Sequence, residues 1–198
     1  MAIIAKNKQS ESVSPIEAGS YPARIYQIIH IGTVAGYQGQ FQNKVRIGFE
    51  LPTEMHVFDE KKGPQPRVIS QDYTLSFSEK ANLRKLIVAC DPKAFELDDN
   101  GLVEEFDVES LMGKSLLVTI GNKPKKDGTG IYAFLEGVTR LPKGMVCEKA
   151  INDPIKLSYD NWDNEVFEKL PDFIKEKIKG SDEYKAMTGE INPADVPF

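Results

Sequence analysis

The sequence predicts a mainly β domain of five strands and one helix, followed by a helical extension and an acidic tail. Alternating apolar and polar residues mark five segments of strand length. One segment with apolar residues at helical spacing lies between the third and the fourth of these strands. After residue 140 the alternation ends, and charged sequence with helical spacing follows. A chain of 198 residues is long enough for one medium domain with such an extension.

The first two predicted strands carry alternating apolar residues. Residues 19–32 form the first strand, and we expect one of its faces to hold Ala23, Ile25, Ile29 and Ile31. Residues 44–51 form the second strand, with inward positions at Val45, Ile47, Phe49 and Leu51. A glycine-rich loop at residues 32–43 joins them. A connection rich in Pro and Gly at residues 52–66 then leads to a third strand at residues 67–77.

The period changes to that of a helix at Ser78. Residues 78–91 place apolar side chains at i, i+3, i+4 and i+7, namely Leu83, Leu86, Ile87 and Cys90. Ser78 is the expected N-cap, and Pro92 ends the helix. Residues 114–120 and 131–140 are the fourth and fifth strands, and a basic, turn-rich loop at residues 121–130 joins them.

Five strands with a helix between the third and the fourth is the order of the OB-fold. This fold is a partly open Greek-key barrel that binds oligonucleotides and oligosaccharides on its strand 2–3 face and loops. Another small α+β barrel or a sandwich is the alternative. We therefore expect an OB-like nucleic-acid-binding barrel at residues 1–140, a helical extension at 141–187 and a partner-binding tail at 188–198. Trp162, the single tryptophan, is expected to anchor the extension against the barrel, with base stacking as the alternative.

Few residues suggest catalysis. The two histidines, His30 and His56, lack the Cys or carboxylate spacing of a metal site. Cys90 fits a core thiol, and Cys147 has no activating neighbour in the sequence. The loop at residues 121–130 lacks the ending of a P-loop. We therefore expect no enzyme, no metal and no cofactor.

Basic and aromatic residues gather around one predicted groove of the barrel. The net charge of −5 argues against a simple duplex DNA binder, yet the acidity is concentrated in residues 141–198, which hold 8 Lys and Arg against 12 Asp and Glu. Lysine and arginine hold phosphates, and aromatic rings stack on bases. The expected nucleic-acid-binding residues are Arg24, Tyr26, Tyr37, Phe41, Lys44, Arg46, Lys123, Lys125, Lys126, Tyr132 and Phe134.

The chain ends in the sequence ADVPF. This ending resembles the C-terminal tip of bacterial single-stranded DNA-binding proteins, which docks on replication and repair enzymes. Here Pro193 and Ala194 interrupt the run of acids that is usual in that family. Over residues 19–33 and 44–52 the body resembles single-strand binders encoded by bacterial viruses. The resemblance implies that partner proteins are bound by Asp195, Val196, Pro197 and Phe198.

These observations lead to one functional hypothesis and its rivals. We expect the chain to coat single-stranded DNA in replication or recombination and to recruit replication or repair proteins through its tail, which can also compete with DNA for the groove. The first rival is an adaptor or inhibitor that binds a host replication protein without touching nucleic acid, and a nuclease accessory factor is the second. No segment has transmembrane length, and the expected location is the cytoplasm, of the host cell if the gene is viral. Homo-oligomers and a preference for RNA are left open, as is a tail in which Phe198 folds back onto the core.

Overall fold

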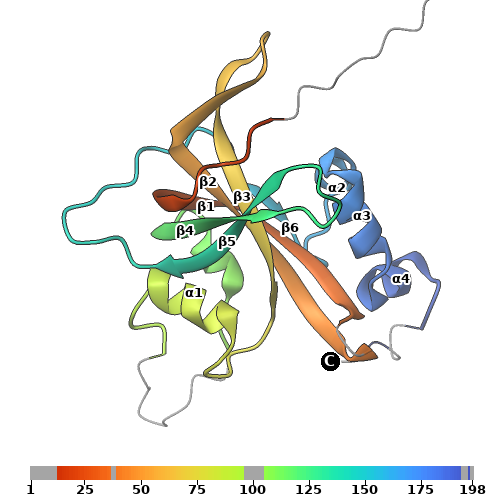
Figure 1. Cartoon of the computed structure of the whole chain (residues 1–198). Helices are drawn as coiled ribbons and strands as arrows, with labels where there is room; N and C mark the ends of the chain where they lie inside the picture. Colours follow the sequence, from red (N-terminus) through yellow and green to blue (C-terminus); the bar gives the residue numbers. More distant parts are fainter. Residues whose placement is uncertain (1–12, 37–38, 96–104, 193–195, 197–198) are drawn as a thin grey trace, which may run out of the picture.

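A curled antiparallel half-barrel of five strands forms the body of the protein, and helices pack on it (Figure 1). The structure is a computed structural model, and it describes residues 13–36, 39–95, 105–192 and 196. The strands are β1 (Gly19–Ala35), β2 (Phe41–Asp59), β3 (Gly63–Thr74), β4 (Ser115–Pro124), β5 (Ile131–Thr139) and the short β6 (Ile155–Leu157). The helices are α1 (Asn82–Cys90), the 3-10 helix η2 (Val108–Leu111), α2 (Asn164–Lys169), α3 (Asp172–Lys179) and α4 (Asp182–Thr188). The prediction of a mainly β fold is confirmed.

The sheet has the strand order β3-β2-β1-β4-β5, with β1 at its centre. One edge of β1 pairs with β2, and the other edge pairs with β4 at its beginning and with β6 further along. The pairing with β6 is parallel, and all the other pairings are antiparallel. In the chain, α1 follows β3 and precedes β4. Because β3 and β5 stand at the two ends of this order, they are the edge strands of the half-barrel.

The core fills the inside of the half-barrel and is closed by α1. The inward residues of β2 are those that the alternation predicts, and they are buried together with the residues of α1 that lie at helical spacing. The helix begins at Asn82 with Ala81 as its N-cap, so the expected cap at Ser78 is wrong. The side chain of Cys90 is half-buried against the core, and burial raises the pKa of its thiol to about 12. This agrees with the prediction of a core thiol.

The two faces of β1 differ from the sequence prediction because the strand is bulged. The register with β2 shifts between Ile25 and Gln27, and again between His30 and Gly32. An extra residue reverses the alternation of side chains between the two faces of a sheet. Ala23 and Ile25 therefore point into the half-barrel, whereas Ile29 and Ile31 pack on the opposite side. The prediction that these four side chains share one face is wrong.

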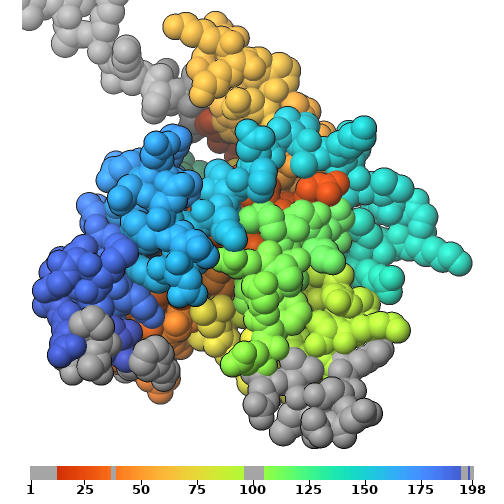
Figure 2. Space-filling view, turned by 180° about the vertical axis from the view of Figure 1, so that it is seen from behind, coloured from red at the N-terminus to blue at the C-terminus, as the bar shows by residue number. Residues whose placement is uncertain are grey.

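The C-terminal segment packs on the outer side of β1. A second apolar cluster joins Ile29 and Ile31 to residues of β6, α2 and α3, with Trp162 and Tyr184 packed against it. Trp162 packs against the cluster that holds Ile29 and Ile31 of the barrel, as expected of an anchor, and its ring stacks on that of Tyr159 with centroids 5.5 Å apart. In the space-filling view this segment, coloured blue, covers one side of the molecule (Figure 2).

Two carboxylates, the buried Glu50 and the half-buried Glu183, fasten the C-terminal segment to the sheet. Glu50 of β2 is fully buried, and it accepts hydrogen bonds from the backbone N–H groups of Ile151 (3.1 Å) and Asn152 (2.6 Å). Glu183 of α4 accepts hydrogen bonds from the backbone N–H and the hydroxyl of Thr33. At Gly32, where φ is +90°, a Cβ would lie 2.5 Å from the Glu183 carboxylate. Glycine at this position therefore permits the close approach of α4.

The β2–β3 hairpin extends beyond the barrel as an arm, at the top of Figure 1. The sequence predicts an irregular connection at residues 52–66, but β2 continues to Asp59 and β3 begins at Gly63. The pairing of β2 with β3 shifts register between Leu51 and Met55 and then continues along the arm. Pro64 and Pro66 lie in an edge strand, where a missing N–H costs little. The boundaries expected for the second and third strands are therefore wrong.

Candidate nucleic-acid interface

The β4–β5 hairpin presents three predicted lysines on a well-defined turn. The backbone N–H of Lys125 donates to the carbonyl oxygen of Gly130 at 2.8 Å and closes the loop. Inside the loop, the Asp127 carboxylate accepts hydrogen bonds from the backbone N–H and the hydroxyl of Thr129. These bonds, the backbone one first, lower the pKa of the Asp127 carboxyl. The turn therefore has a fixed shape, and the side chains of Lys123, Lys125 and Lys126 are exposed on it.

Two aromatic rings lie beside these lysines on the same hairpin. Phe134 is opposite Gly121 in the register, and Tyr132 is opposite Lys123. A Cβ on Gly121 would lie 2.8 Å from the Phe134 ring, so glycine leaves room for the ring to lie flat on the strand. The Lys123 ammonium is 4.1 Å from the centroid of that ring, a cation–π contact. The Tyr132 ring is 43% exposed, and its centroid is 6.3 Å from that of Phe134.

This arrangement has the chemistry that single-stranded nucleic acid needs. An exposed ring stacks on any base for about 1–3 kcal/mol, and neighbouring ammonium groups hold the phosphates. Within the part of the chain that the structure describes, Lys123, Lys125 and Lys126 form no ion pair with an acid. Their charges are therefore available to a ligand.

The two predicted arginines make contacts inside the fold. Arg24 donates to the carbonyl oxygens of Gly113 (3.1 Å) and Glu148 (2.8 Å), and so ties β1 to two loops. Arg46 pairs with Asp72, the residue opposite it on β3, and donates to Ser70. Its guanidinium also lies 5.3 Å from the centroid of the Phe173 ring of α3.

Asp72 is the centre of this second group of charges. It also pairs with Lys177 of α3. Burial alone would raise the pKa of the Asp72 carboxyl, but the hydrogen bonds and charges of Lys177 and Arg46 outweigh burial and lower the pKa. The sequence analysis missed both Asp72 and Lys177. An acid and a base directly opposite each other on paired strands are a usable signal for Asp72, once the register is known.

The other predicted residues of β1 and β2 differ in exposure. Tyr26 is half-buried in the bulge of β1 against Gly48, and burial, followed by the charge of Glu50, raises the pKa of its hydroxyl. Lys44 is half-exposed opposite Thr74. Phe41 is 62% exposed at the start of β2.

The structure therefore brings part of the predicted set together. Lys123, Lys125, Lys126, Tyr132 and Phe134 share one hairpin, while Arg24, Tyr26, Phe41, Lys44 and Arg46 are distributed along β1 and β2. Tyr37 lies outside the described residues, as do Asp195, Pro197 and Phe198 of the tail, and Val196 is half-buried. The role of each of these residues stays a prediction.

Comparison with known protein families and with curated proteins found no match for this chain. In the described ranges, no group of three or more His, Cys, Asp and Glu side chains is placed to hold a metal ion. Among the helices that the structure describes, none has both the length and the apolar character needed to cross a membrane.

Proposed function

We propose that the chain is an OB-type protein without enzymatic activity that binds single-stranded DNA independently of sequence, in replication or recombination. The β4–β5 hairpin carries this proposal, because three exposed lysines and an exposed tyrosine lie together on it. The sheet order, with β1 at the centre and β3 and β5 at the edges, supports an OB-like barrel, whose strand 4–5 loop contributes to ligand binding. Lys44 and Phe41 are available on β2 to extend the contact.

A comparison of single strands with duplex tests the proposal. A fluorescent oligo(dT) and a duplex of equal length are titrated with the full-length protein at two salt concentrations. The single strand binds more tightly, because its bases are free to stack on Tyr132, and binding weakens with salt because phosphate contacts release counterions. Equal competition by the duplex would contradict the proposal.

We propose that the C-terminal residues recruit replication or repair proteins. In this mechanism the Phe198 ring enters an apolar pocket of the partner, and the α-carboxylate meets a basic rim. Removal of Pro197 and Phe198 then abolishes capture of such partners while the melting temperature stays unchanged, because the last residues of a domain usually contribute little to stability. A clear drop in melting temperature would instead place the ring in the core.

A second candidate function is that of an adaptor or inhibitor that binds a host replication protein and no nucleic acid. The β2–β3 arm favours it, because Met55, Val57 and Phe58 are 44–48% exposed on a projecting hairpin. Contiguous exposed apolar side chains are typical of protein interaction sites. Under this alternative, oligo(dT) does not bind at any salt concentration, and Val57→Ser with Phe58→Ser abolishes capture of the partner protein.

A further inference from the structure

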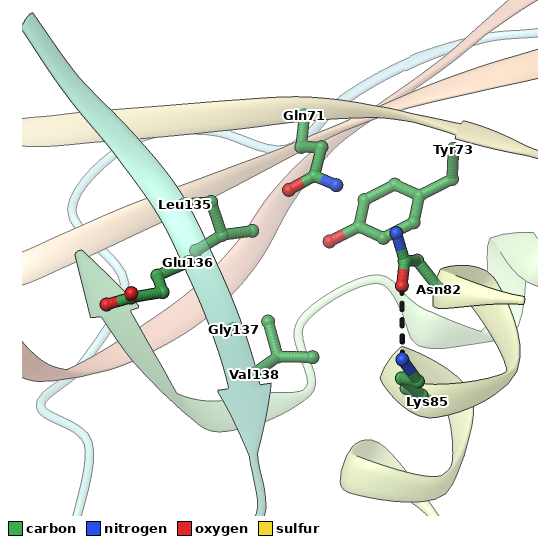
Figure 3. Close-up of a pocket in the computed structure, with 8 residues that line it drawn as sticks. All are labelled: Gln71, Tyr73, Asn82, Lys85, Leu135, Glu136, Gly137 and Val138. Carbon is green, nitrogen blue, oxygen red and sulfur yellow. Dashed lines mark hydrogen bonds between the residues drawn. The ribbon is translucent and has the colours of Figure 1, made fainter. Parts of the chain in front are cut away.

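A cavity of about 360 Å³ lies at the seam of the half-barrel, between the edge strands β3 and β5 and above α1 (Figure 3). Its size is within the range of small-molecule sites, about 300–1,000 Å³. Gln71 and Tyr73 line it from β3, Asn82 and Lys85 from α1, and Leu135 and Val138 from β5. The cavity is separate from the exposed surface of the β4–β5 hairpin.

Two polar side chains of β3, those of Gln71 and Tyr73, point into the cavity. Tyr73 is only 3% exposed, and Figure 3 shows its hydroxyl directed into the cavity. Among the described residues, burial and the charge of Cys90 raise the pKa of this hydroxyl, and no hydrogen bond acts on it. Gln71 alternates with Ile69 and Tyr73 of the core, so its amide occupies an inward position where an apolar side chain is expected. The Tyr73 side chain is buried up to the cavity wall, so a ligand in the cavity can reach its hydroxyl and the half-exposed Gln71 amide beside it.

The lining of the cavity includes one basic and one acidic residue. The Lys85 ammonium lies at its edge and donates to the Asn82 side-chain oxygen at 3.4 Å. Glu136 is the one acid of the lining, and Figure 3 shows its carboxylate turned away from the cavity. That carboxylate lies near Gly121 on the outer face of the hairpin, 3.5 Å from the place of a Cβ on Gly121. Leu135 and Val138 form an apolar wall across from Tyr73.

We propose that this seam cavity binds one nucleotide unit. A nucleotide combines a flat ring with apolar faces, a polar ring edge and an anionic phosphate. Leu135 and Val138 offer a surface for the ring, the Gln71 amide and the Tyr73 hydroxyl offer hydrogen bonds to its edge, and Lys85 attracts the phosphate. The ligand is either a free nucleotide or one residue of a bound strand, and in the second case the inference rests on the proposed function.

The test uses the full-length protein, titrated calorimetrically with each of the four deoxynucleoside monophosphates and with inorganic phosphate. Tyr73→Phe removes only the hydroxyl, which has no hydrogen-bond partner among the described residues, so the fold is retained. It weakens nucleotide binding by about two- to tenfold, the effect of one hydrogen bond. Lys85→Gln weakens nucleotide binding as well. Lys62→Gln, the matched control at an exposed lysine in the turn between β2 and β3, leaves it unchanged.

The outcomes separate this inference from the proposed function. The hairpin variant with Lys123, Lys125 and Lys126 changed to Gln loses oligo(dT) affinity but keeps nucleotide binding at the seam. Nucleotide binding by a protein that does not bind oligo(dT) supports the seam site for free nucleotides and refutes the proposed function. Three results overturn the seam site alone. These are that no nucleotide binds, that inorganic phosphate binds as tightly as a nucleotide, or that Tyr73→Phe leaves nucleotide binding unchanged.

Discussion

Neutralising the three hairpin lysines should change the salt dependence of DNA binding by a calculable amount. For single strands, the slope of log K against log salt concentration is about −0.7 for each phosphate contact. Lys123, Lys125 and Lys126 are exposed and unpaired in the described part of the chain, so each is free to make one contact. Changing all three to Gln should make the slope shallower by about 2. Between about 50 and about 200 mM salt, the wild-type protein then loses about 15-fold more affinity than the variant.

The assay is fluorescence anisotropy of labelled oligo(dT) over a series of salt concentrations, with circular dichroism to verify the fold. The matched control changes three other exposed lysines, Lys80, Lys143 and Lys149, to Gln. It alters the net charge by the same amount at a distance from the hairpin turn. The reasoning is refuted if the hairpin variant keeps the wild-type slope, or if the control variant makes the slope as shallow as the hairpin variant does.

Three further outcomes follow from individual contacts. Tyr132→Ala should weaken oligo(dT) binding by about 1–3 kcal/mol without altering the salt slope, because stacking is not ionic; a changed slope in the anisotropy series would contradict this. Glu50→Gln should lower the unfolding free energy by about 1.5–3 kcal/mol and the melting temperature by about 3–12 °C, since the charge that strengthens the bonds from two backbone N–H groups is lost; an unchanged thermal melt would argue against the clamp. The pKa of Asp72 is lowered on folding, so its ionised form stabilises the protein above the unfolded pKa, and this contribution is lost as pH falls through the folded pKa; acid unfolding of Asp72→Asn should lack that contribution.

The sequence predicts the elements of the fold better than their faces. Strict alternation along β2 correctly identifies the side chains that enter the core, because the alternation continues without interruption through Phe49. In β1 the same rule fails at Ile29, since the bulges that reverse the faces arise from pairing with neighbouring strands. The arm is missed for a related reason: Pro and Gly normally mark connections, but an edge strand tolerates them.

The sequence likewise predicts those parts of the candidate site that depend on local contacts better than those that depend on distant ones. The β4–β5 hairpin is local, so its lysines and aromatic residues are brought together as their spacing in the sequence suggests. The partners of Arg24 and Arg46 come from elsewhere in the chain, at Glu148 and Asp72. The alternation of apolar and polar residues in the sequence does not indicate such contacts. The seam cavity is equally hidden, because it needs β3, α1 and β5 to meet around Tyr73.

The C-terminal segment determines which surface is left for a ligand. It covers the outer side of β1 at Ile29 and Ile31, and α3 places Lys177 and Phe173 against the Arg46–Asp72 pair. Freeing Arg46 to hold a phosphate would break its part-buried ion pair with Asp72, which costs free energy. The hairpin lysines require no such rearrangement, because their ammonium groups are already exposed. Single-stranded DNA that binds this protein is therefore expected to follow the β4–β5 hairpin. Arg46 instead holds α3 on the barrel.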